Sequence, residues 1–167
     1  MRKKNRFAFF GSYLRQAPTL LFVLVLMAMA AVVSNFVMLP VDMGWLPDLE
    51  FFPSPNVDNY GTWPLIFMSI IVAPLAETLL FQHVPYAVLR RVSFFATNRW
   101  AMLVVSGAIF GAMHYYSLAY ILATSLMGGV MMYGYIVKYR RRAYWSMVLF
   151  HSMWNLLVVV MQLLGVE

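Results

Sequence analysis

The sequence contains no cysteine and few charged residues. The absence of cysteine from all 167 positions excludes disulfide bonds, a thiol nucleophile and cysteine-ligated metals. Only 11% of the residues are charged and 63% are hydrophobic, a composition that excludes an ordinary soluble domain. We therefore expect an integral membrane protein that crosses the lipid bilayer several times, with residues 1–167 forming a single membrane domain.

Acidic residues are scarce as well, and most of them lie in one segment. Residues 40–59 contain Asp42, Asp48, Glu50 and Asp58 but no Lys or Arg, which predicts an external loop. The net charge of +6 comes from short basic clusters between apolar runs. Such clusters indicate membrane topology rather than a nucleic-acid partner.

Long apolar runs separate these clusters and predict an all-α, polytopic membrane bundle of about five transmembrane helices. Since lipid offers no partner for backbone groups, runs of this length must be helical. The expected crossings are residues 18–39, 63–89, 144–164 and two within 100–137, divided by a tight turn near 115–118. Every basic cluster then lies on one side of the membrane, so the positive-inside rule places the N-terminus in the cytoplasm.

Glu77 is the only acidic residue between the external loop and the last residue, and it lies inside the second apolar run. A charge near the bilayer centre costs about 2.5 to 3.5 kcal/mol, so Glu77 needs a partner, a proton or a water-filled cavity. The other polar side chains expected at depth are His114, His151 and Asn155. Counting about 1.5 Å per residue from the nearest inner basic residue places Glu77, His114 and Asn155 at about 20 to 22 Å, with His151 about 6 Å shallower. A common depth on three helices predicts one shared site.

Local spacing supports this prediction. His151 and Asn155 are four residues apart and project from one helical face. Gly107, Gly111 and His114 form a stripe, and two glycines at this spacing let another helix approach closely.

A proline beside the acidic residue is the other local signal. Pro74 precedes Glu77 by three residues and leaves the carbonyl of Ile70 without its helical donor. This predicts a kink at which freed backbone can hold a water molecule.

These motifs resemble those of the CAAX prenyl endopeptidase and bacteriocin-processing (CPBP) family of glutamic intramembrane proteases. The family pattern is Glu-Glu-x-x-x-Arg, then Phe-x-x-x-His, then His-x-x-x-Asn or Asp, on successive helices. The counterparts, in the same order, are Glu77 to Gln82, Phe110 to His114 and His151 to Asn155. The resemblance covers a helical core within residues 62–167 and leaves out the first crossing and acidic loop, residues 1–61. It implies an intramembrane endopeptidase that cleaves a peptide or protein substrate at the membrane.

Two positions depart from the family pattern. The second glutamate is Thr78 and the arginine is Gln82. An ion pair four residues apart is thus replaced by two neutral side chains spaced for a hydrogen bond, and the local charge balance is unchanged. The first glutamate, which the resemblance makes the catalytic one, is retained as Glu77.

The residues suggest a mechanism that uses no cofactor. Glu77 is expected to take a proton from water as general base, while His114 positions or polarises that water. His151 and Asn155 are expected to donate hydrogen bonds to the developing oxyanion. Three neighbours are expected to support this site: Thr78, Gln82 and Phe110.

Other interpretations of the same polar layer stay open. Two histidines and a glutamate can ligate zinc, with metal-bound water as the nucleophile. A membrane immunity or adaptor protein could use the layer to bind a partner helix without catalysis. A proton or solute carrier is less favoured because the sequence shows no inverted repeat. The small size suggests a bacterial cytoplasmic membrane, and the sequence predicts neither an oligomeric state nor a particular substrate.

Overall fold

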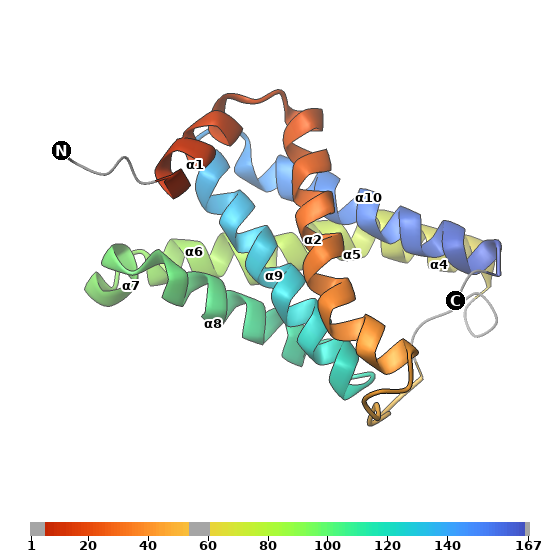
Figure 1. The fold of residues 1–167 in the computed structure, drawn as a ribbon. Coiled ribbons are helices and arrows are strands. Elements are labelled where there is room, and N and C mark those ends of the chain that lie inside the picture. The colour runs from red at the N-terminus through yellow and green to blue at the C-terminus, as the bar shows by residue number, and fades with distance from the viewer. Residues whose placement is uncertain (1–5, 54–60, 166–167) are drawn as a thin grey trace.

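The computed structural model describes residues 6–53 and 61–165, with side chains from residue 11 onward. In these ranges the chain is an all-α bundle, as predicted (Figure 1). In chain order the helices are α1 (Arg6–Gln16), α2 (Thr19–Asp42), α4 (Thr62–Phe67), η1 (Met68–Val72), α5 (Ala73–Thr78), η2 (Leu79–His83), α6 (Val84–Leu89), α7 (Ser93–Thr97), α8 (Arg99–Ala112), α9 (Leu118–Lys138) and α10 (Ala143–Leu163). Segments α4 to α6 follow one another without a break and form one rod, in which η1 and η2 are π-helical.

Four stretches are long and apolar enough to cross a membrane: α2, the rod from α4 to α6, α9 and α10. The remaining expected crossing is α8, an apolar helix of 14 residues. The tight turn predicted near residues 115–118 lies between α8 and α9, at residues 113–117. The predicted division of the long apolar run is therefore confirmed.

The first crossing extends further than predicted. Helix α2 continues through Pro40 to Asp42, although the sequence places the start of the external loop at residue 40. Pro40 has no amide proton to donate to the Phe36 carbonyl, but the helical hydrogen bonds continue beyond it, since the Met43 amide donates to the Leu39 carbonyl at 3.0 Å.

Helix α1 was not predicted, because its sequence is too short and too polar for a crossing. It packs beside α9, with Leu14 fully buried. The buried Lys138 side chain donates from Nζ to the carbonyl of Ala17 at 2.7 Å and to that of Arg15 at 3.4 Å. These carbonyls lie at the end of α1, where a helix has no backbone donors of its own, so the lysine joins α1 to α9.

Two glycines set the distance between α8 and α9. A Cβ atom at Gly107 would collide with the Ser125 carbonyl oxygen, and one at Gly111 with the Ser125 hydroxyl. The close helix approach predicted for this stripe is confirmed, and α9 is the partner.

The acidic segment that was predicted to be an external loop binds the turn that carries His114. The Phe51 amide donates to the Tyr116 carbonyl at 2.7 Å, and Asp48 Oδ1 accepts from the Ala119 amide at 2.9 Å. We call these contacts of residues 48–52 with residues 115–119 the clasp. The rest of the predicted loop, including Asp58, lies outside the described residues.

Candidate active site

Glu77 lies on α5, between the two π-helical segments η1 and η2. A proline follows each π segment closely: Pro74 is two residues beyond η1 and Pro85 is two beyond η2. Proline has no amide proton, so it interrupts the helical hydrogen-bond ladder at both places. The irregularity predicted at Pro74 therefore takes the form of a π segment, a feature that is frequent at functional sites.

The π register determines which carbonyl Pro74 leaves free. The Ala73 amide donates to Met68, five residues earlier. In the same register the next donor would be Pro74, which has no amide proton and so leaves the Ser69 carbonyl without an intrahelical donor. Asn155 Nδ2 donates to the Ser69 carbonyl at 2.7 Å.

Two further side chains bond backbone carbonyls of the same rod. The Tyr144 hydroxyl donates to the carbonyl of Leu75 at 2.9 Å. The Ser106 hydroxyl donates to the carbonyl of Phe81, which lies four residues before Pro85. Side chains from α8 and α10 thus fix the rod on both sides of Glu77.

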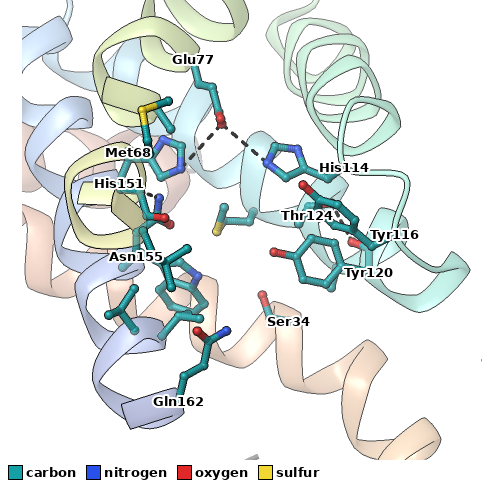
Figure 2. A pocket seen from close by; sticks show the side chains of 18 of the residues that line it. Ser34, Met68, Glu77, His114, Tyr116, Tyr120, Thr124, His151, Asn155 and Gln162 are labelled. Carbon is teal, nitrogen blue, oxygen red and sulfur yellow. Dashed lines mark hydrogen bonds and ion pairs between the residues drawn. The ribbon is translucent and has the colours of Figure 1, made fainter. Parts of the chain in front are cut away.

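Glu77, His114 and His151 meet in the interior of the bundle (Figure 2). Glu77 Oε2 lies 3.6 Å from His114 Nε2 and 3.8 Å from His151 Nε2. The side chain of His151 is only 2% exposed, that of His114 17% and that of Glu77 24%. Glu77 on α5, His151 on α10 and His114 in the turn just beyond α8 are therefore within reach of one bound water or one substrate atom.

Phe110 and its backbone orient His114. His114 Nδ1 lies 2.8 Å from the Phe110 carbonyl oxygen, which can only accept, so the proton of the neutral ring is on Nδ1. His114 Nε2 then presents its lone pair to Glu77. The buried Phe110 ring lies between the two histidines, with its centroid 4.4 Å from that of His114 and 5.8 Å from that of His151.

The predicted hydrogen bond between Thr78 and Gln82 is absent. Both side chains are fully buried, and within the described part of the chain neither the Thr78 hydroxyl nor the Gln82 amide has a hydrogen-bond partner. The prediction was wrong because it assumed an α-helix, whereas η2 begins at Leu79 and changes the angle between the two side chains.

A cavity of about 530 Å³ extends from Glu77 between α2, α9, α10 and the rod. Asn155 lines it together with Glu77, His114 and His151. Sequence reasoning missed several other residues that line it: Met68, Tyr116, Tyr120, Thr124, Trp154 and Gln162. The positions of Tyr116 and Tyr120 just after His114 are the signal that could have identified them. The Tyr120 hydroxyl points into the cavity (Figure 2).

Metal binding was the alternative use of this residue set. Over residues 6–53 and 61–165, no group of three His, Asp or Glu side chains is arranged to hold a metal ion. Whether hydrolysis depends on zinc can be decided by removing metal ions in a cleavage assay.

Comparison with protein families identifies the chain. The family described as type II CAAX prenyl endopeptidase Rce1-like matches residues 59–157. The chain belongs to this Rce1-like family. The match runs over the rod, α8, α9 and more than half of α10, and it includes Glu77, both cavity histidines and Asn155. No curated protein and no solved structure matches the chain.

Membership of the Rce1-like family agrees with the predicted resemblance to CPBP proteases. Together with the apolar helices, it makes the chain an integral membrane protein of a CAAX-type intramembrane protease family, whose substrates are peptides or proteins at the membrane. Helix α2 and the described part of the predicted external loop lie outside the matched residues.

Proposed function

We propose that this protein is a glutamic intramembrane endopeptidase in which Glu77 activates water. The observation that carries the proposal is the distance of Glu77 Oε2 from two imidazole nitrogens, 3.6 and 3.8 Å, inside a cavity. Neither distance is a direct hydrogen bond, for which about 2.7 to 3.2 Å is typical. A water molecule can instead donate one hydrogen to Glu77 and the other to the lone pair of His114 Nε2.

In the first step Glu77 takes a proton from this water as its oxygen attacks the carbonyl carbon of the scissile peptide bond. A new C–O bond forms, and the carbonyl oxygen becomes an oxyanion. Glu77 then gives the proton to the amide nitrogen as the C–N bond breaks. The products are a carboxylic acid and an amine, and no nucleophilic serine or cysteine takes part.

The oxyanion needs hydrogen-bond donors, each worth about 2.7 to 4 kcal/mol where such donors have been removed from other enzymes. His151 Nδ1 is buried and has no hydrogen-bond partner in the described residues, so the neutral ring keeps its proton on Nε2, which faces the cavity. Asn155 uses one N–H for Ser69, and its amide group has a second one to offer. The Tyr120 hydroxyl is a third donor directed into the same space.

The test is to incubate the purified protein and its Glu77→Gln variant with a library of membrane peptides and to identify the products by mass spectrometry. Loss of the base should remove nearly all cleavage while the nearly isosteric side chain preserves binding. Glu50→Gln is the matched control, because it makes the same change in an exposed loop residue. Identical products from the wild type and Glu77→Gln would leave the non-catalytic binding protein as the better explanation.

The same assay distinguishes the glutamate mechanism from the zinc mechanism. Hydrolysis that continues after thorough metal removal supports Glu77 as the base acting on free water. Loss of hydrolysis on chelation, followed by recovery on addition of zinc, would instead assign the nucleophile to metal-bound water.

A further inference from the structure

Burial is distributed unevenly along the bundle. The four buried residues of α2, from Phe22 to Ala30, all lie in its first half. Five of the six buried residues of α10 lie between Ala143 and His151. In α2 and α10 burial is therefore concentrated in the half next to the basic clusters, whereas the buried residues of α8 lie chiefly in its half away from Arg99.

The contacts of the rod also change along its length. Segment η2 packs against α8, α9 and α10, whereas η1 and α5 pack chiefly against α10. The part of the rod that precedes Glu77, which points away from the basic clusters, therefore lies apart from α9. In Figure 1, α4 and the end of α10 run together in one direction, while the end of α2 and the start of α9 run in another.

The cavity occupies the space that this separation creates. Glu77 and His151 lie near the midpoints of their helices. The other helical residues that line the cavity come from the half of each helix remote from the basic clusters: Ser34 and Met38 of α2, residues 64–73 of the rod, 120–127 of α9 and 154–162 of α10. Beyond the triad of Glu77 and the two histidines, every lining residue is uncharged. Figure 2 shows Ser34 and Gln162 at the end of the cavity opposite Glu77.

The charges assign the two ends of the bundle to the two sides of the membrane. One end of the bundle carries Arg90, Arg91, Arg99 and the cluster of residues 138–142. The other end carries the acidic segment of residues 42–50 and no Lys or Arg in the described chain. Under the positive-inside rule the basic end faces the cytoplasm.

We propose that the catalytic cavity is entered from the external face of the membrane and takes an extended, apolar, uncharged peptide segment presented from that face. The substrate part of this proposal rests on the proposed proteolysis. A volume of about 530 Å³ suits a short segment rather than a folded domain. A cationic side chain would pair with Glu77 and block the base, and an anionic one would be repelled by it.

Cysteine labelling tests the side of entry, and the cysteine-free chain is suited to it. Met68→Cys and Gln162→Cys place a thiol in the cavity. Trp45→Cys is the external reference, Arg141→Cys the cytoplasmic one, and Val104→Cys the lipid-facing one, since Val104 is 69% exposed outside the cavity. The probe is a membrane-impermeant maleimide, added to intact cells or to inverted membrane vesicles.

We expect the cavity cysteines to be labelled in intact cells, together with Trp45→Cys, and to be protected in inverted vesicles. Labelling only in inverted vesicles, together with Arg141→Cys, would overturn the proposal. Labelling from neither side, as expected for Val104→Cys, would also overturn it, because the cavity would then have no aqueous entrance.

Protection by peptides tests the substrate class. In the Glu77→Gln background, an uncharged apolar peptide added outside should slow labelling of Met68→Cys several-fold, whereas the same peptide with a central lysine should not. Equal protection by both peptides would overturn the substrate assignment. Because labelling needs no hydrolysis, the side of entry can be established even if Glu77 proves not to be the catalytic base.

Discussion

At the scale of single residues, the decisive feature is which nitrogen each histidine turns toward Glu77. His114 donates from Nδ1 to the Phe110 carbonyl and keeps its Nε2 lone pair for water. We expect His114→Gln to lower kcat by about 10² to 10⁴-fold, the usual contribution of a positioned acid–base group. Peptide cleavage assays with purified variants measure this.

The matched control for His114→Gln is His83→Gln. His83 lies outside the cavity, where its Nδ1 is 2.6 Å from the Tyr135 hydroxyl. The control should keep kcat within a few-fold of the wild type. Equal losses in both variants would mean that the loss reflects damage to the bundle rather than to water activation.

Among single residues, Tyr120 lines the cavity but is not part of the family pattern. If its hydroxyl binds the oxyanion, Tyr120→Phe should lower kcat by roughly 10² to 10³-fold with little change in KM, because the interaction forms in the transition state. Tyr115→Phe is the control, since Tyr115 is exposed and does not line the cavity. An increase in KM alone for Tyr120→Phe would assign the hydroxyl to substrate binding instead.

At the scale of elements, the π segments determine where Glu77 points. Pro74→Ala restores an amide donor and lets η1 tighten toward the α-helical register, which turns Glu77 relative to Asn155. We expect activity to fall at least tenfold while the thermal unfolding temperature is maintained or raised. Parallel cleavage assays and thermal unfolding in detergent measure the two effects.

A proline at a helix start provides the comparison for Pro74→Ala. Pro18 is the N-cap of α2, where no intrahelical donor is needed, so Pro18→Ala should leave activity unchanged. Full activity in Pro74→Ala would show that the π register is not needed for catalysis.

At the scale of the whole molecule, the clasp joins segments 71 residues apart in the sequence. Burial raises the pKa of Asp48, but hydrogen bonds from Ser117 and from the backbone amides of Ala119 and Leu49 outweigh it, so the pKa lies below its usual value. A carboxylate with a lowered pKa in the folded state stabilises the fold above the unfolded pKa of about 3.9. This contribution is lost as the pH falls through the folded pKa.

The clasp therefore predicts a pH-dependent effect of Asp48→Asn. The asparagine of the variant still offers an oxygen to the Ala119 amide but carries no charge. At pH 7 the variant should therefore be less stable than the wild type by about 0.3 to 1 kcal/mol, the value typical of a negative charge at a helix N-terminus. Below the folded pKa the difference should vanish, because wild-type Asp48 is then protonated too. Thermal unfolding across pH measures it, and Asp42→Asn at an exposed position is the control. A difference that persists in acid would mean that the carboxylate charge is not what stabilises the clasp.

Depth along the membrane could be read from the sequence, but direction around each helix could not. Counting residues from the basic clusters placed Glu77 and His114 at one height, and the structure brings their side chains together. Because the prediction assumed about 100° of rotation per residue, as in an α-helix, it contained neither the π segments nor the hydrogen bond from Asn155 to the Ser69 carbonyl. Contacts between distant segments, such as the clasp and the lysine that joins α1 to α9, leave no local pattern that a sequence could reveal.

The short length of α8 has a consequence for the lipid around it. A helix of 14 residues rises about 21 Å, less than a hydrocarbon layer of about 30 Å. Bilayers thin locally around such a helix, at a cost of fractions of a kcal/mol per Å of mismatch. We therefore expect the acyl-chain length of the host membrane to change the depth at which His114, just beyond the end of α8, lies below the membrane surface.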